Sequence, residues 1–181
     1  KANLPATAKE TIMSLPPDLS DRLRGILGTR LSQAAADCDH HAQSESFHRS
    51  ASPDAVAWPD SAEEVAAILA ICNEARVPVI AWGTGTSLEG HALPVQGGIS
   101  LDLSRMDRVV EIRAEDMQAT VQPGVTREAL NTELRATGLF FPVDPGANAS
   151  LGGMAATRAS GTTAVRYGTQ HQVVAINKGT Q

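Results

Sequence analysis

A glycine-rich stretch directly after a short apolar run constrains this chain more than any other feature. The apolar run at 77–82 predicts a buried strand, and residues 83–90 then read G-T-G-T-S-L-E-G. Glycines let backbone N–H groups approach a ligand closely, and threonine and serine hydroxyls add donors, so this loop could hold a phosphate without a lysine. A tight turn that binds no ligand is the alternative, and a glycine-rich loop alone does not decide between the two.

Two common phosphate-binding patterns do not match this loop. The pattern G-x-G-x-x-G would need glycine at position 88, which is Leu88, and a Walker loop would need lysine after Gly90, where His91 stands. A nicotinamide-binding fold of the usual kind and an NTP-binding domain are therefore both disfavoured. His91 could donate to a cofactor or substrate, or be a structural histidine with its hydrogen bonds satisfied.

A second cluster of small residues follows later in the chain. Residues 142–146 read P-V-D-P-G, and S-L-G-G-M-A-A-T at 150–157 leads to A-S-G at 159–161. Such small side chains indicate that something large presses on the backbone, and a helix beginning near Ser150 would direct its amides at an anion. Two such segments facing each other would clamp one dinucleotide, which is the site that the sequence predicts.

The remaining elements predict an α/β fold, with α+β character where hairpins occur. A capping box at Ser61 and Glu64 begins a helix over 62–76. Apolar residues at helical spacing between Leu19 and Leu31 predict another helix, with Gly28 close to its end. Thr126 is expected to cap a helix that ends at Gly138. Strands are predicted at 99–103, 109–112, 119–122, 139–143 and 173–176, the first two of these around a turn at 104–107, and the polar stretch 34–52 is predicted to be a loop.

Composition excludes several classes of function. With 15 basic and 20 acidic side chains the net charge is −5, and only 3% of residues are aromatic. Nucleic acid is therefore a poor partner, because duplex binding needs basic residues and single strands need aromatic stacking. No run of 18 apolar residues predicts a transmembrane segment. We expect a cytoplasmic protein and leave attachment to a membrane surface open.

The cysteines and histidines predict neither a disulfide framework nor a metal site. Cys38 and Cys72 lie 34 positions apart and form no C-x-x-C unit, which fits a reducing compartment. Cys38 and the nearby His40, His41 and His48 match no zinc spacing, so we interpret them as solvated loop residues. Cys72 falls on the apolar face of its helix and is expected in the core.

Several longer strings carry a resemblance to a known family. They are P-D-A-V-A-W-P at 53–59, G-T-G-T-S-L-E-G-H at 83–91, Q-P-G-V-T-R-E-A-L-N at 122–131, F-P-V-D-P-G-A at 141–147 and G-G-M-A-A-T at 152–157. Residues 53–172 resemble the FAD-binding domain of the vanillyl-alcohol oxidase or p-cresol methylhydroxylase (PCMH) type. Within that type they are most similar to FAD-linked D-lactate dehydrogenases and to the flavin-binding subunit of glycolate oxidase.

The resemblance implies an α/β (α+β) PCMH-type fold: two small subdomains with FAD between them, the second one truncated. Residues 1–52 would be an N-terminal helix and loop extension, and 53–181 the FAD-binding domain, incomplete at its C-terminus. The loop 83–90 would wrap the pyrophosphate, and Thr86 stands where some relatives carry a flavin-linked histidine, so binding would be non-covalent. The implied cofactor contacts are Gly83, Thr84, Gly85, Thr86, Ser87, Leu88, Gly90, Pro142, Asp144, Pro145, Gly146, Ser150, Gly152, Gly153, Ala155 and Gly161.

The activity implied by the resemblance is oxidation of a D-2-hydroxy acid, D-lactate first, with electrons passed to a cytochrome or quinone. Catalytic residues are unassigned here, because relatives carry them in a C-terminal domain, and this chain alone is expected to turn over little or no substrate. The sequence departs from the family pattern at Gln170-His171-Gln172. The alternative is an inactive remnant that serves only as a folded or partner-binding module. A bulky residue at Gly85 is expected to abolish FAD binding by filling phosphate space.

Overall fold

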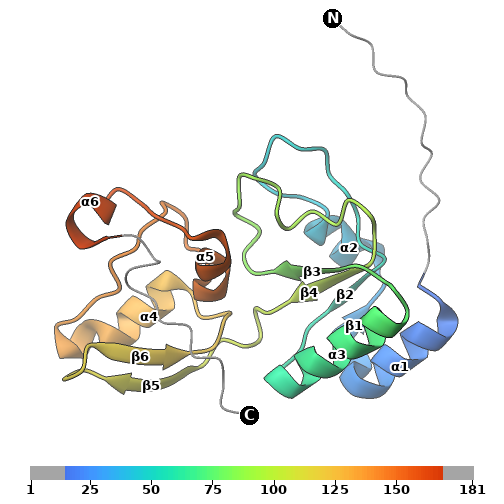
Figure 1. Cartoon of the computed structure of the whole chain (residues 1–181), viewed down its shortest axis with the longest axis horizontal. Coiled ribbons are helices and arrows are strands. Elements are labelled where there is room, and N and C mark those ends of the chain that lie inside the picture. Colours follow the sequence, from blue (N-terminus) through green and yellow to red (C-terminus); the bar gives the residue numbers. More distant parts are fainter. Residues whose placement is uncertain (1–14, 169–181) are drawn as a thin grey trace, which may run out of the picture.

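A four-stranded sheet organises the first half of the chain in the computed structural model, which describes residues 15–168. Its strands are β1 (Leu31–Ser32), β2 (Ala55–Ala57), β3 (Val79–Trp82) and β4 (Ile99–Asp102), in the order β1-β2-β4-β3 (Figure 1). β2 and β3 both run parallel to β4. Because β3 ends where the glycine loop begins, the loop leaves the carboxyl end of a parallel strand, which is where open α/β sheets bind ligands.

Helices cover both faces of this sheet. α1 (Pro17–Leu27) and α3 (Ala62–Glu74) cover one face, where their apolar side chains form a core with Ile99 and Leu101 of β4. The predicted capping box is confirmed at the start of α3, since the Ser61 hydroxyl accepts a hydrogen bond from the Glu64 N–H. A short 3-10 helix, η1 (Gly28–Arg30), joins α1 to β1. Residues that we predicted to be an extension before residue 53 thus contribute to the same core as the strands that follow.

The stretch 34–52 is not entirely a loop, and the prediction was wrong on this point. Residues Ala35–His41 form α2, which lies on the opposite face of the sheet from α1 and α3 (Figure 1). Cys38 and His41 are three positions apart, so both point to the sheet, and both are buried. Of the four residues interpreted as solvated, only His40 and His48 are exposed.

The second half of the chain forms a separate lobe around a hairpin. β5 (Val109–Arg113) and β6 (Gln118–Val121) pair antiparallel, with a bulge near Val109. α4 (Arg127–Leu134), extended by η2 (Arg135–Thr137), packs with α5 (Leu151–Thr157) around a core of Val125, Leu130, Val143 and Met154. The Thr126 cap and the Gly138 stop are confirmed, the latter with φ of 75°. α6 (Ala164–Tyr167) follows.

Two predicted strand assignments differ from the structure. The strands at 99–102 and 109–113 belong to different sheets, so the turn between them links the two lobes rather than closing a hairpin. The apolar run 139–143 pairs with no strand among residues 15–168; instead the Phe141 N–H donates to the Asn131 side chain of α4 at 2.6 Å. Its hydrophobicity reflects packing of Val143 into the core. The strand predicted at 173–176 lies outside the described residues.

Candidate cofactor site

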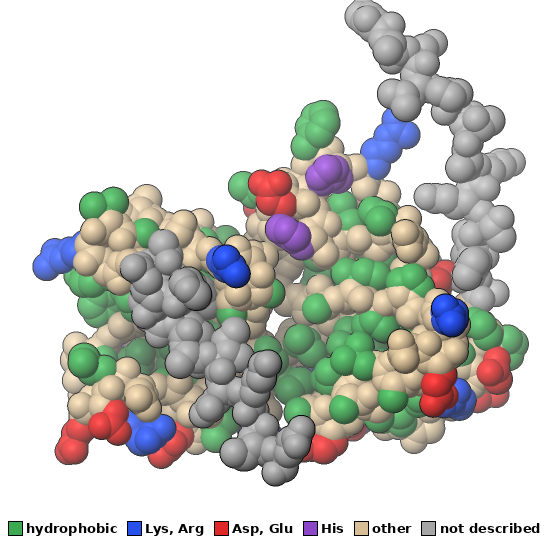
Figure 2. Space-filling model, in the orientation of Figure 1, with side chains coloured by type: hydrophobic (Ala, Val, Ile, Leu, Met, Phe, Trp, Pro, Cys, Tyr) green, Lys and Arg blue, Asp and Glu red, His purple; other side chains and the backbone are tan. Residues whose placement is uncertain are grey.

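The two predicted loops meet where the lobes face each other. A Cβ atom added to Gly83, the first residue after β3, would overlap the Ser150 hydroxyl at the start of α5. Figure 1 shows α5 on the side of its lobe that faces β3 and β4, and Figure 2 shows a hollow in the surface between the lobes. The predicted proximity of the two segments is therefore present, and only a residue without a side chain permits it at position 83.

The backbone amides of the glycine loop have no acceptors in the described part of the chain. No hydrogen bond joins the N–H groups of residues 83–88 to any acceptor within residues 15–168. The hydroxyls of Thr84 and Thr86 lie 3.2 Å apart, and that of Ser87 lies 2.8 Å from the His91 ring. Consecutive free amides with three hydroxyls beside them suit an anion such as a pyrophosphate. Leu88 points outward and is largely exposed.

Gly85 lies above the ring of Trp82, which corrects one sequence-based argument. A Cβ at Gly85 would lie 2.5 Å from a carbon of the Trp82 indole, and Gly85 has a φ of 69°. A side chain there would therefore strike the protein itself, not fill the space expected for a phosphate. Gly90, at the far end of the loop, similarly lies against the His48 ring.

The helix N-terminus at Ser150 does not offer its amides to a ligand, contrary to the prediction. The Leu151 and Gly152 N–H groups donate to the carbonyls of Val125 and Pro123 at 2.8 and 2.9 Å. The Gly153 N–H donates to the Ser150 hydroxyl at 3.3 Å, which caps the helix. α5 is thus fixed to the start of the second lobe, and a Cβ at Gly152 would meet Pro123. Its small residues are explained by packing within the chain, and Ala155 is half-buried beside them.

The segment 142–146 and the turn before α6 lie side by side. Gly161 approaches the Asp144 backbone so closely that a Cβ would overlap its carbonyl, and the Thr163 hydroxyl donates to the Pro142 carbonyl at 2.5 Å. The Asp144 carboxylate accepts from the Gly146 N–H at 3.0 Å and pairs with Arg127 at 3.5 Å. Asp144 therefore closes a turn, one of the two roles considered for it, and its contact with a flavin or ribose stays a prediction. Pro145 and Gly146 are exposed at this turn.

A buried ion pair beneath the glycine loop was missed by the sequence analysis. His41 Nε2 lies 3.0 Å from Asp102 Oδ2, and His41 Nδ1 lies 2.9 Å from the Asp37 carbonyl. Burial lowers the pKa of His41, but the hydrogen bonds to Asp102 and Asp37 outweigh it and raise that pKa above its ordinary value. Likewise burial raises the pKa of Asp102, and hydrogen bonds from His41, Ser104 and Trp58 lower it below its usual range. The spacing of Cys38 and His41 was the only signal available in the sequence.

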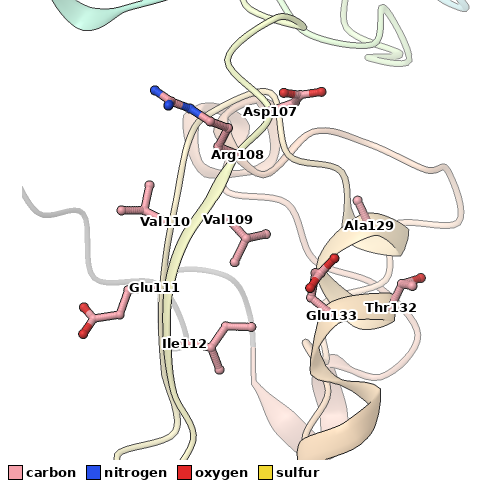
Figure 3. A pocket seen from close by; sticks show the side chains of 9 residues that line it. All are labelled: Asp107, Arg108, Val109, Val110, Glu111, Ile112, Ala129, Thr132 and Glu133. Carbon is pink, nitrogen blue, oxygen red and sulfur yellow. The ribbon is translucent and has the colours of Figure 1, made fainter.

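A cavity of about 650 Å³ lies in the second lobe, away from the glycine loop. Figure 3 shows β5 on one side of it and α4 on the other, with Val109 and Ile112 pointing from the strand toward the helix. The residues that line it include Asp107, Glu111 and Glu133 with one cation, Arg108, and the Glu111 side chain points away from α4 (Figure 3). This excess of negative charge disfavours an anionic dinucleotide, so we do not place the cofactor there.

Neither a helix suited to a lipid bilayer nor a cluster of metal-binding side chains occurs within residues 15–168. Each helix described there is too short or too polar to span a bilayer. No group of three or more histidine, cysteine or acidic side chains in the same range is arranged to hold a metal ion.

The chain is similar to known proteins over most of its length. The sequence profile of the "FAD binding domain" family matches residues 53–176. A probable mitochondrial D-lactate dehydrogenase of Danio rerio is 54% identical over 83% of this chain and 31% of its own length. A mitochondrial D-lactate dehydrogenase [cytochrome] of Arabidopsis thaliana is 43% identical over 96% of this chain and 31% of its own. The chain thus spans about a third of the length of these relatives.

Solved structures share the arrangement of the lobes. A structure of alkyldihydroxyacetonephosphate synthase matches with a TM-score of 0.80 and 25% identity, over 87% of this chain and 32% of that one. p-Cresol methylhydroxylase with substrate bound matches with a TM-score of 0.61 and 27% identity, over 70% of this chain and 25% of that one.

Proposed function

Because the chain belongs to the FAD binding domain family, we propose that it is the FAD-binding part of a flavoprotein oxidoreductase that acts on a D-2-hydroxy acid. The predicted α/β (α+β) fold of PCMH type is confirmed by the family match and by the solved structures that share it. D-lactate is the favoured substrate, since relatives at 54% and 43% identity carry the name D-lactate dehydrogenase. The second of those names supports a cytochrome as the electron acceptor.

The free amides of residues 83–88 are the observation that carries FAD binding. We assign the diphosphate to these amides and to the hydroxyls of Thr84, Thr86 and Ser87, which donate to its oxygens while the bare backbone of Gly83 faces Ser150. Because the diphosphate is anionic and this loop contains no basic residue, recognition depends on oriented N–H dipoles. Thr86 offers no ring nitrogen for a bond to the flavin, so we propose non-covalent binding.

The protein's share of the reaction is to bind and orient, since the cofactor supplies the redox chemistry. Bound FAD would supply a two-electron acceptor: the C2–H bond of the hydroxy acid would break with its electron pair passing to the flavin as a hydride, and the hydroxyl proton would pass to a base, leaving the 2-oxo acid. We assign that base and the ligands of the substrate carboxylate to the part of a full-length relative that this chain does not match. The 16 cofactor contacts named from the sequence remain a proposal, with α5 as a support rather than an amide donor.

The test is direct titration of the purified chain with FAD, followed by quenching of flavin fluorescence and by calorimetry. We expect one FAD per chain, released intact on denaturation, and no reduction of the bound flavin by D-lactate. Flavin that stays attached to the denatured protein would contradict non-covalent binding. A folded chain that leaves the fluorescence of FAD unchanged would contradict the proposal and favour the remnant without a cofactor.

A further inference from the structure

Trp82 lies between the buried ion pair and the glycine loop. It is the last residue of β3 and only 5% exposed. On one side its indole contacts the His41 ring, with centroids 4.6 Å apart. On another side it lies under Gly85, so close that a Cβ added to Gly85 would be 2.5 Å from an indole carbon. The indole therefore contacts both the His41 ring and the middle of the loop.

The hydrogen bonds of His41 define its protonation state. Its two ring nitrogens face a carboxylate oxygen and a carbonyl oxygen, neither of which carries a proton to donate. Both nitrogens must therefore donate, which makes His41 an imidazolium paired with the Asp102 carboxylate. Asp102 is held in turn by the Trp58 indole N–H and the Ser104 N–H, both at 2.8 Å. Every polar atom of the pair has a partner, so the ring orientation is fixed.

We propose that His41 and Asp102 are positioning residues for the glycine loop: they hold Trp82 in place beneath Gly85 and so keep the loop amides in the conformation that binds the FAD diphosphate. This inference rests on the proposed function. A neutral imidazole has a single N–H and would leave either Asp102 or the Asp37 carbonyl without its donor. The ring would then lose its fixed orientation, and Trp82 would lose its support.

The charged and titratable groups around His41 are few. Asp102 faces it from β4, and Asp37 and His40 flank it on its own helix α2. The remaining ring contacts come from Trp82 of β3 and from Trp58, which carry no charge. Deprotonation of His41 as the pH rises would therefore act on the loop through the ring contact with Trp82.

The experiment compares Asp102→Asn with Glu64→Gln in the 181-residue chain. Glu64 pairs with Arg30 in the same lobe, at 2.5 Å, and touches neither Trp82 nor the loop, so it controls for general loss of stability. Because the loop amides donate to no acceptor within residues 15–168, hydrogen exchange would not report their order, and the order is measured by 15N relaxation instead. In Asp102→Asn we expect the order parameters of residues 83–88 without FAD to fall from about 0.8 to below about 0.6, with α3 unchanged. We expect FAD affinity to fall by about 10-fold or more. Glu64→Gln should leave both the loop order parameters and FAD affinity unchanged.

Two further readouts separate positioning from simple destabilisation. The FAD affinity of the unmodified chain should fall as the pH rises through the titration of His41, whereas that of Asp102→Asn should be weak and nearly flat over the same range. Trp82→Phe keeps a flat ring under Gly85 and should retain affinity, whereas Trp82→Ala should not. If Asp102 only stabilised the fold, FAD affinity would depend on pH in the same way in both proteins. Trp82→Phe and Trp82→Ala would then bind FAD alike.

The outcomes test the positioning role of His41 and Asp102 separately from the proposed function. If the unmodified chain does not bind FAD, the proposed function fails, and the order parameters of the loop still test the positioning role. If it binds FAD and Asp102→Asn matches it in affinity and in loop order parameters, the positioning role is overturned. Should Asp102→Asn fail to fold, His41→Gln is judged by the same two measurements, because its side chain can donate to only one of the two acceptors at a time.

Discussion

At the scale of single residues, the contact between Gly83 and Ser150 links the two lobes at the proposed site. Because an added Cβ at position 83 would overlap the Ser150 hydroxyl, we expect Gly83→Ala to move α5 away from the loop and weaken FAD binding about 10-fold. Ser150→Ala removes the overlapping oxygen. The Cβ that remains at position 150 would lie 3.5 Å from the methyl group added at position 83, which is an ordinary contact. The double variant should therefore recover most of the affinity, as measured by titration with FAD.

Ser150→Ala alone is the control for this rescue. It removes the hydroxyl that caps α5, so we expect a loss of about 1 kcal/mol in the free energy of unfolding. FAD affinity should fall by less than in Gly83→Ala, since the Ser150 hydroxyl already accepts from the Gly153 N–H and its loss does not push α5 away from the loop. A double variant that binds FAD no better than Gly83→Ala would show that the overlap with Ser150 is not the cause.

His41 and Asp102 also predict how stability depends on pH. The pKa of His41 is raised in the folded state, so its contribution is fully present below the pKa of an unfolded histidine and is lost as pH rises through the folded pKa. We expect the free energy of unfolding, measured by urea titration, to decline above neutral pH. In His41→Gln this decline should disappear; its persistence would assign the pH dependence to another group.

At the scale of elements, one ion pair joins the N-terminal segment to α3. Arg30 of η1 makes two hydrogen bonds to the Glu64 carboxylate, 2.5 and 2.6 Å long, and these lower the pKa of Glu64 from 4.5 to about 2. The Glu64 side chain is 23% exposed, so solvent screening limits the pair, and we expect Glu64→Gln to cost about 1 kcal/mol at neutral pH. Because a lowered pKa stabilises above the unfolded value, this difference should shrink from about pH 4.5 and vanish near pH 2.

Urea unfolding of the two proteins at neutral and acid pH tests this prediction. The ion pair of Arg22 and Glu74 provides a control. Both of its side chains are exposed, so Glu74→Gln should have almost no effect on the free energy of unfolding at either pH. An equal difference between Glu64→Gln and the unmodified chain at both pH values would contradict the assignment.

Elements with local signals were predicted correctly, and those defined by tertiary contacts were not. Caps at Ser61 and Thr126 and the stop at Gly138 fix helix ends through bonds within a few residues, so the sequence reveals them. The run 139–143 was taken for a strand because it is apolar, although its backbone bonds to a side chain of α4. The turn at 104–107 gives no sign that the strands beside it join different sheets.

The candidate site was predicted as two segments but not in its chemistry. A glycine-rich loop after a strand is a local pattern, and the structure places it against Ser150 as expected. That α5 has already used its first amides depends on Val125 and Pro123, which lie far from Ser150 in the sequence. The same holds for His41 and Asp102, which are 61 positions apart. Partners at such separations leave no periodicity that a single sequence could reveal.

At the scale of the whole molecule, the described chain has two hydrophobic cores. One contains Leu19, Leu23 and Ile68 beneath the four-stranded sheet, and the other contains Leu130 and Met154 behind the hairpin. Within residues 15–168 the hairpin sheet has only two strands, which is marginal without further packing. The proposed ligand lies where the lobes meet, so its binding energy would act between the cores as well as within each of them.

This arrangement predicts two-step unfolding without FAD and coupled unfolding with it. We expect Leu23→Ala to destabilise the first lobe and Leu130→Ala the second, so that each lowers the midpoint of its own transition. The unfolding free energy of that lobe should fall by about 2–5 kcal/mol, because both side chains are almost fully buried. A ligand that binds only when both lobes are folded adds about 2.7 kcal/mol at a free concentration of 100 times Kd. In calorimetry the two transitions should therefore merge on addition of FAD, and either leucine variant should shift the merged transition. Two transitions that stay separate at saturating FAD would show that the cofactor contacts one lobe only, and would remove the segment after Ser150 from the site.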